Sequence, residues 1–198
     1  MSQFLETIQL RDGEFKLLEL HQKRMDLAIS ENYPNVESIP LSEYLHQSNY
    51  PTKGLYKCRL LFSSNIEKLE FVPYEQPIIK TLKVIETNLP TWLYKLSDRS
   101  SIQELVDQKG EFDDVLILRD GLLTDTSYCN IALLKGNQWF TPRLALLYGV
   151  QRAHLLQEKQ IIEKDILVTE LSHYSKICLF NAMNEFGALQ LSISDIVI

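Results

Sequence analysis

The chain has 198 residues and a formal net charge of −6, with 45% hydrophobic and 23% charged residues. This composition is ordinary for a folded globular protein and excludes a chain that is disordered throughout. The acidic balance disfavours nucleic acid as a partner, because an acidic surface repels the phosphate backbone, although a local basic pocket for a small anion stays open.

The cysteine and hydropathy patterns narrow the class further. The cysteines at 58, 129 and 178 lie far apart and form no CxxC pair, which disfavours a zinc site or a disulfide scaffold and is typical of a reducing cytoplasm. No signal-peptide pattern opens the chain, and no apolar stretch approaches the roughly 18 residues needed to cross a membrane. We therefore expect a cytoplasmic protein, without a membrane partner and without a metal site.

The first part of the chain, residues 1–72, is predicted to form a small α+β lobe. Asp12-Gly13 is a hairpin turn, apolar spacing of the helical kind follows it, and Pro34 ends that helix. Ser42 is the expected N-cap of a second, short helix. In chain order the predicted elements are strands at 4–10 and 14–17, helices at 17–32 and 42–47, and a hairpin of strands at 54–63 and 68–72.

Residues 73–77 hold two prolines in five positions and are the expected linker to a larger lobe, 78–198. Strands outnumber helices there, and the two kinds do not strictly alternate, which favours an α+β class over a doubly wound parallel sheet. The predicted strands lie at 78–86, 115–118, 130–134, 138–140, 177–180 and 189–198, and the predicted helices at 101–109 (capped by Ser101), 149–159 and 169–174.

Common catalytic and nucleotide-binding motifs are missing: we find no GxGxxG, P-loop, HExxH, EF-hand or GxSxG pattern. The polar residues that remain each have an ordinary structural explanation. Lys95 has the type of a surface lysine, Arg24 that of a solvated or salt-bridged helical arginine, and Asn130 that of a cap or turn residue. Gly149 stands at a common loop-to-helix junction. No one of them indicates a function by itself.

Taken together and in order, these segments resemble the class IV aminotransferase family, the fold-type IV pyridoxal-phosphate enzymes. That family includes branched-chain aminotransferase, D-amino-acid aminotransferase and aminodeoxychorismate lyase. The resemblance covers nearly the whole chain. It implies a homodimer with its sites near the interface, and pyridoxal phosphate between the small lobe and the larger, cofactor-binding lobe. The segments that carry it are FLETIQLRDGEFKLLELHQKRMD, YK at 94–95, DGLLTDTSYCN, WFTPRLALLYGVQRAHLL and LFNAMNEF.

The resemblance implies a role for each candidate residue. Lys95 would hold the cofactor covalently and act as general base. Asp125, at a position where the family more often has Glu, would keep the pyridine nitrogen protonated. The phosphate would be bound by a guanidinium and by backbone N–H groups at a helix start and on a late strand. These phosphate-binding residues are Arg24, Val150, Gln151, Ala182 and Met183.

Two further cations are candidates for binding a substrate carboxylate. Arg99 follows Lys95 by four residues, and its alternative explanation is an ion pair at the surface with Asp98. Arg59 lies in a predicted strand, where alternation leaves either face open to it.

The function we expect is that of a 4-amino-4-deoxychorismate lyase, which releases pyruvate and forms 4-aminobenzoate, a folate precursor. The first lobe is trimmed between Arg24 and the linker, and a lyase handles a single substrate in its pocket. The alternatives are an aminotransferase for branched-chain or D-amino acids, and a non-catalytic member of the family.

Overall fold

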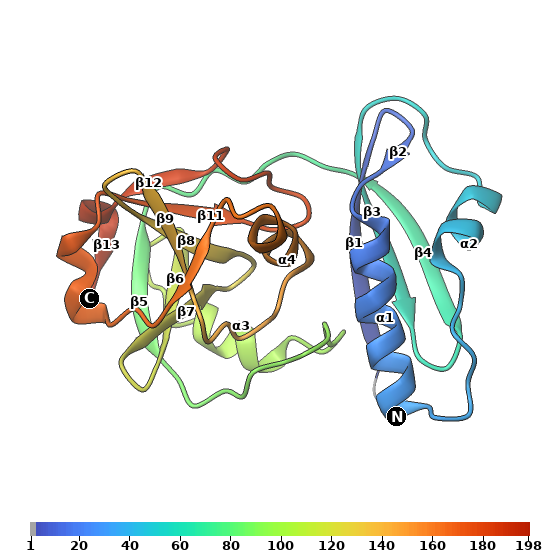
Figure 1. The fold of residues 1–198 in the computed structure, drawn as a ribbon, viewed down its shortest axis with the longest axis horizontal. Helices are drawn as coiled ribbons and strands as arrows, with labels where there is room; N and C mark the ends of the chain where they lie inside the picture. The colour runs from blue at the N-terminus through green and yellow to red at the C-terminus, as the bar shows by residue number, and fades with distance from the viewer. Residues whose placement is uncertain (1–2) are drawn as a thin grey trace. The chain divides into compact units, whose positions relative to one another are not determined.

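The computed structural model describes residues 3–198. Its contacts divide the chain into two compact units. Unit 1 comprises Met1–Gln76 and Trp92–Asp98, and unit 2 comprises Pro77–Thr91 and Arg99–Ile198. Both units combine helices with strands (Figure 1), so the predicted α+β class is confirmed.

Unit 1 is an antiparallel four-stranded sheet with the strand order β2-β1-β3-β4, accompanied by helices α1 and α2. The Asp12-Gly13 hairpin is confirmed: both residues have positive φ, and they join the first two strands. The elements are β1 (Phe4–Arg11), β2 (Glu14–Phe15), α1 (Leu18–Asn32), α2 (Leu41–Gln47), β3 (Leu55–Phe62) and β4 (Ile66–Pro73).

The two faces of this sheet differ in chemistry. Phe4 and Ile8 of β1 are fully buried in one cluster with Met25 and Ile29 of α1. Because side chains alternate along a strand, Glu6 lies on this same face and Thr7 lies on the opposite one. The helix therefore covers one face of β1, and the face that carries Thr7 is left to other contacts.

The segment Trp92–Asp98 belongs to unit 1, whereas the sequence predicts it in the larger lobe with the rest of 78–198. Its backbone lies along β1: the Leu5 N–H donates to the Lys95 carbonyl at 2.9 Å, and Phe4 forms an isolated bridge with Leu96. β2 pairs with β1 only at Leu10 and Arg11, so the other end of that edge of β1 has free backbone groups for the segment.

Unit 2 holds a branched nine-stranded sheet. Its main path runs β10-β9-β8-β7-β6-β5-β13, and β11 pairs with both β8 and β12. The strands are β5 (Leu82–Glu86), β6 (Asp114–Arg119), β7 (Leu122–Thr126), β8 (Asn130–Lys135), β9 (Gln138–Pro142), β10 (Ile162–Lys164), β11 (Lys176–Phe180), β12 (Gln190–Ser192) and β13 (Ile196–Val197), and the α-helices are α3 (Ser100–Val106) and α4 (Val150–Gln157).

The junction of β7 and β8 is narrow. The two strands pair only at Asp125 and Asn130, and the residues between them form a tight turn in which the Thr126 N–H donates to the Cys129 carbonyl. Beyond Asn130, β8 turns to pair with β9 and β11. Asp125 thus lies where the sheet branches, opposite Asn130.

Several predicted details are wrong. α2 begins after Pro40 and α3 after Arg99, and neither helix has a side-chain cap, so Ser42 and Ser101 are not N-caps. The helix at 169–174 is the 3₁₀ segment Val168–His173, and the strand predicted over 189–198 is split into β12 and β13. Between residues 3 and 198 the structure contains no helix that combines the length and the apolar character needed to cross a membrane.

Candidate functional site

Lys95 lies beside β1, held there by the backbone contacts of its own segment. Its Nζ donates a hydrogen bond to Thr7 Oγ1 at 3.0 Å, and its side chain is partly buried. Thr7 faces away from α1, so the Lys95 amine lies on the face of β1 that the helix does not cover.

Arg59 shares that face. It pairs directly with Thr7 across β1 and β3, which puts the two side chains on the same side of the sheet. Its Nη1 lies 3.2 Å from Glu70 Oε2 on the next strand, and 42% of its side chain is exposed. The alternation that sequence left open is thereby settled, and Arg59 is a partly exposed cation near Lys95 in unit 1.

Arg24 is not a solvated arginine. Its Nε and Nη2 donate to the two carboxylate oxygens of Glu6 at 2.8 and 2.7 Å, and only 9% of its side chain is exposed. Arg24 and Glu6 form a two-pronged pair on the α1 face of the sheet. Any anion that Arg24 binds must use the guanidinium donors that Glu6 leaves over.

His21 completes this buried network. Its Nδ1 lies 2.5 Å from Glu6 Oε2, and neither side chain has more than 1% exposure. Arg24 and His21 overcome the effect of burial and lower the pKa of Glu6 to about 2, while burial lowers the pKa of His21. An ionised Glu6 can only accept, so neutral His21 donates from Nδ1, and its Nε2 is buried with no partner among the described residues.

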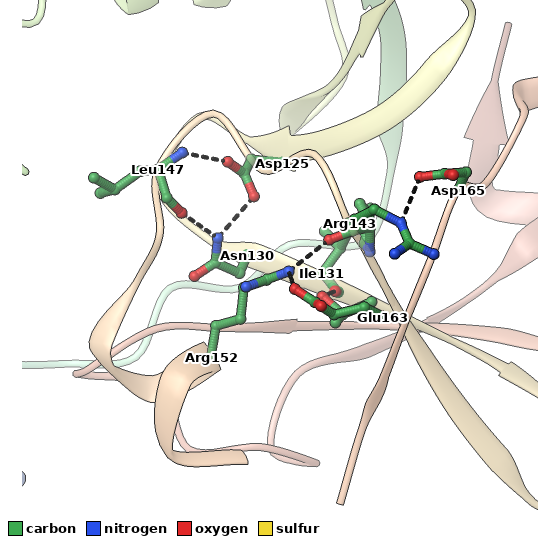
Figure 2. Close-up of polar contacts among 10 residues, drawn as sticks. Asp125, Asn130, Ile131, Arg143, Leu147, Arg152, Glu163 and Asp165 are labelled. Atoms are coloured by element: carbon green, nitrogen blue, oxygen red, sulfur yellow. Dashed lines mark hydrogen bonds and ion pairs between the residues drawn. The ribbon is translucent and has the colours of Figure 1, made fainter. Parts of the chain in front are cut away.

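In unit 2, Asp125 is held by the loop that precedes α4. Asp125 Oδ2 accepts the Leu147 N–H at 2.9 Å, and its Oδ1 accepts Asn130 Nδ2 at 2.8 Å. The same Asn130 amide also donates to the Leu147 carbonyl at 2.8 Å, which closes a ring of three hydrogen bonds (Figure 2). The carboxylate is 5% exposed and has a fixed orientation.

Opposing effects act on the pKa of the Asp125 carboxyl. Burial raises its pKa to about 6, while donors at Leu147, Asn130 and Leu146 and the positive charge of Arg152 oppose that rise. A carboxylate has about four acceptor positions, so three donors leave room for one more. This is a buried acid that can take a further N–H donor, which fits a protonated ring nitrogen.

The start of α4 lies in the same loop. Gly149 is its N-cap and supplies no side chain, and the first helical bond is the one from the Ala153 N–H to the Gly149 carbonyl. The N–H groups of Val150 and Gln151 therefore have no acceptor within the helix. Such a helix start suits an anion, both through its N–H groups and through the helix dipole.

Arg152 connects α4 to the neighbouring strands β9 and β10. Its Nη2 donates to the Pro142 carbonyl at 2.9 Å and lies 2.7 Å from Glu163 Oε1 (Figure 2). The guanidinium is almost completely buried, and it ties α4 to β9 and β10. A separate, exposed pair joins Arg143 and Asp165, the residues that directly follow these two strands.

The sequence predicts that the backbone N–H groups of Ala182 and Met183 bind the phosphate, and the structure gives one of them an acceptor within the chain. Asn181 Oδ1 accepts the N–H groups of Met183 and Asn184 at 2.8 and 2.9 Å, forming a tight polar turn after β11. The Met183 N–H therefore already has an acceptor within the chain. Ala182 lies at the tip of that turn, between residues that form it.

Arg99 lies against the turn that joins β7 to β8. Its Nη2 donates to the Ser127 carbonyl at 2.6 Å, and its guanidinium stacks over the ring of Tyr128 with 4.3 Å to the centroid. Asn181 donates to the Tyr128 carbonyl from the other side. Arg99 therefore contacts Ser127, two residues beyond Asp125 in the chain, and belongs to the unit that holds Asp125.

The structure brings the candidate residues together in two groups. Lys95 and Arg59 share one face of the unit 1 sheet, with Arg24 on the other; Asp125, Val150, Gln151, Ala182, Met183 and Arg99 belong to unit 2. The sequence assigned no role in the site to Glu6, Thr7, His21 or Asn130, although all four lie in segments that carry the family resemblance. Among residues 3–198, the structure forms no cluster of His, Cys, Asp and Glu suited to a metal ion.

Comparisons with known proteins bear on the family and the fold of this chain. Residues 103–189 match the family described as amino-transferase class IV. A solved protein of Haemophilus somnus, named a candidate 4-amino-4-deoxychorismate lyase, is 33% identical; the match covers 93% of this chain and 98% of that one, with a TM-score of 0.86. A Schizosaccharomyces pombe protein named a candidate aminodeoxychorismate lyase is 29% identical over 130 residues, which is 61% of this chain and 56% of that protein.

A more distant structure shares the fold. It is a hypothetical aminotransferase from Mycobacterium tuberculosis, solved in a form bound to pyridoxal phosphate. The identity is 16%, the TM-score is 0.76, and the match covers 93% of this chain and 79% of that one. At this identity the likeness concerns the fold alone.

Proposed function

Because the chain belongs to the class IV aminotransferase family, we propose that it is a pyridoxal-phosphate enzyme acting as a 4-amino-4-deoxychorismate lyase. The observation that supports this cofactor is the buried Asp125 carboxylate, which accepts the Leu147 N–H in the loop before α4. The lyase activity is supported by the names of two relatives and by a first lobe that we expect to serve one substrate.

The residues of unit 2 fit this cofactor. Asp125 has an acceptor position left for a ring N–H, and the N–H groups of Val150 and Gln151 suit a phosphate. When bound, pyridoxal phosphate supplies an aldehyde for the substrate's amino group and a ring that withdraws electrons from the neighbouring carbon. Asp125 keeps the ring nitrogen protonated and so sustains that withdrawal.

Lys95 has the two roles that the chemistry requires of an amine. It holds the cofactor covalently at rest, and it takes the proton from the substrate carbon that bears the amino group. Thr7 Oγ1, which accepts its hydrogen bond, directs Nζ on the face of β1 away from α1. Arg24 contributes positive charge for the phosphate through the donors that Glu6 leaves over.

The substrate is a dicarboxylate, so it needs cations. Arg99 and Arg59 are the residues we propose for its carboxylates. In the reaction the bond between the ring carbon and the enolpyruvyl oxygen breaks, the ring becomes aromatic, and the removed proton is balanced by the one that converts the departing enol to pyruvate. The amino group stays on the product.

Product analysis tests the proposal. Purified protein with pyridoxal phosphate and 4-amino-4-deoxychorismate should release 4-aminobenzoate and pyruvate in equal amounts, with no keto acid added. An aminotransferase would stop after one equivalent and would continue only with a keto acid, because it leaves the amino group on the cofactor. Continued turnover with leucine or D-alanine and 2-oxoglutarate, but not with 4-amino-4-deoxychorismate, would overturn the lyase assignment.

Two further features belong to the same proposal. The family resemblance implies a homodimer, which sedimentation equilibrium of the cofactor-loaded protein would detect. We place this activity in the cytoplasm, because three free cysteines are typical of a reducing compartment. Cofactor binding without turnover of any amino compound would favour the non-catalytic alternative.

A further inference from the structure

Asn130 connects two parts of the proposed cofactor site. Its Nδ2 donates both to Asp125 Oδ1 and to the Leu147 carbonyl, each at 2.8 Å. The Leu147 N–H in turn donates to Asp125 Oδ2. One side-chain amide thus joins the strand that carries the acid to the loop that opens α4, as the closed ring of Figure 2 shows.

The other atom of this amide reaches the helix start itself. A Cβ placed on Gly149 would lie 2.1 Å from Asn130 Oδ1, which is closer than any real contact. Gly149 has an ordinary φ of −71°, so its backbone does not require glycine. The position has no side chain because Asn130 fills that space at the N-cap of α4.

Building on the function proposed above, we propose that Asn130 is a positioning residue that locks the Asp125 carboxylate and the N-terminus of α4 into one fixed arrangement. The acid that faces the ring nitrogen and the N–H groups that face the phosphate then cannot move independently. A cofactor that contacts both binds to a site that is already assembled, and it loses less conformational entropy on binding.

The same amide also adjusts the charge of Asp125. Burial raises the pKa of this carboxyl, and Asn130 is one of the donors that oppose the rise. The titratable groups that face Asp125 are Arg152 on α4, which favours the ionised form, and Cys129 in the adjoining turn, whose own pKa burial raises to about 12. Removing the Asn130 donor raises the pKa of Asp125 further and leaves more of it protonated at neutral pH.

Two variants of Asn130 test this role against a matched control. Asn130→Ala removes the amide, and Asn130→Asp keeps its shape while exchanging the donor for a second carboxylate. Thr141→Val is the control. It removes a buried hydrogen bond from a side chain to a backbone carbonyl, donated by Thr141 Oγ1 to Ile131, the residue that follows Asn130, at 2.8 Å. This bond involves neither Asp125 nor α4.

Two quantities are measured for each protein: the dissociation constant of pyridoxal phosphate between pH 5.5 and 9, and the carbon-13 titration of the Asp125 carboxyl in the cofactor-free protein. We expect Asn130→Ala to weaken binding at least about tenfold relative to Thr141→Val and to move the Asp125 titration to higher pH. For Asn130→Asp, binding should recover as pH falls, because a shared proton restores a donor between the two carboxylates.

The outcomes separate this inference from the proposed function. If the unaltered protein does not bind pyridoxal phosphate, the proposed function fails and takes the inference with it. If it binds, and Asn130→Ala matches Thr141→Val in affinity with an unmoved Asp125 titration, only the role of Asn130 is overturned. Should Asn130→Ala fail to fold, the isosteric Asn130→Asp decides: affinity that does not change with pH any differently from the control also overturns the role.

Discussion

At the scale of single residues, the structure gives Arg24 a role that the sequence did not indicate. The sequence left open a phosphate-binding cation or an ordinary solvated or salt-bridged helical residue, and it named no partner. The structure pairs it with the buried Glu6, which also binds His21. Removing Arg24 would leave the Glu6 carboxylate buried without its arginine partner. Losing one partner of a buried ion pair costs stability, because the remaining charge is left uncompensated.

We therefore predict that Arg24→Ala destabilises the fold by about 3–5 kcal/mol, in addition to any loss of cofactor affinity. Lys23→Ala, on the exposed side of the same helix, should change stability by no more than about 0.5 kcal/mol. Urea unfolding of both variants at pH 7.5 measures the difference. Equal, small effects would mean that the Glu6 pair contributes little.

Acid should reveal the same pair. The folded-state pKa of Glu6, about 2, is depressed below its ordinary value of 4.5, so its contribution is present above pH 4.5 and is lost as pH falls toward 2. The shift corresponds to about 3 kcal/mol. His21, whose pKa is also lowered, destabilises the fold below pH 6.5 in the same direction. In Arg24→Ala the folded-state pKa of Glu6 rises toward its ordinary value, so the loss of stability between pH 4.5 and 2 should be smaller than in the unaltered protein.

Lys95 is the residue on which the proposed chemistry depends. Borohydride reduction of the cofactor-loaded protein, followed by peptide mapping, should place the label on Lys95. Lys95→Ala should abolish turnover with little loss of stability, because the side chain is partly exposed. A label on Lys80, Lys83 or Lys109 would contradict the assignment, since these are its nearest competitors in the chain.

At the scale of elements, the start of α4 depends on its neighbour β8. Gly149 lacks a side chain because Asn130 occupies the space, so Gly149→Ala should cost about 1–3 kcal/mol of stability. The cost should shrink when Asn130 is already alanine, because the clash then disappears. A double-mutant cycle by thermal unfolding measures this coupling, expected to exceed about 0.5 kcal/mol. Additive effects would show that the contact relaxes without strain.

Element prediction failed at one place for a local reason and at another for a tertiary one. The strand expected over 189–198 is broken by a 3₁₀ turn, in which Ser192 and Asp195 form a capping box. The charged strand β10 has no apolar alternation to reveal it, and it forms only because its backbone pairs with β9. By contrast, α1 and the β3–β4 hairpin have strong local patterns and lie where the sequence predicts them.

At the scale of the whole molecule, unit 1 is built from two separate stretches of chain. Residues 92–98 supply the acceptor for the Leu5 N–H and pack Tyr94 on Phe4, with 5.0 Å between the ring centroids. A fragment that ends at Gln76 lacks these contacts and exposes the edge of β1. Exposed strand edges promote aggregation.

We predict that a fragment of residues 1–98 unfolds cooperatively, whereas one of residues 1–76 aggregates or unfolds at lower temperature. Circular dichroism and light scattering during heating measure the difference. In the longer fragment, Leu96→Ala should remove part of the gain, because Leu96 packs on the apolar cluster of unit 1. Equal behaviour of the two fragments would mean that Trp92–Asp98 is not needed for unit 1 to fold.

What the sequence determined by itself is what depends on local pattern and residue type. Helical spacing such as that of α1 and turns such as Asp12-Gly13 revealed helices and strands that do not strictly alternate, which led to the α+β class. The ordered motifs led to the family. These signals survive in one dimension because periodicity and turn chemistry act between residues that are close in the chain.

Only the tertiary structure decided which groups meet. Glu6 and Arg24 are far apart in the chain, as are Lys95 and Thr7, and no local pattern records that they bond. The burial that lowers the pKa of Glu6 through its partners and raises that of Asp125 likewise depends on elements packed from elsewhere. Hydrogen-bond partners and dielectric surroundings are properties of the folded chain, because long-range packing creates both.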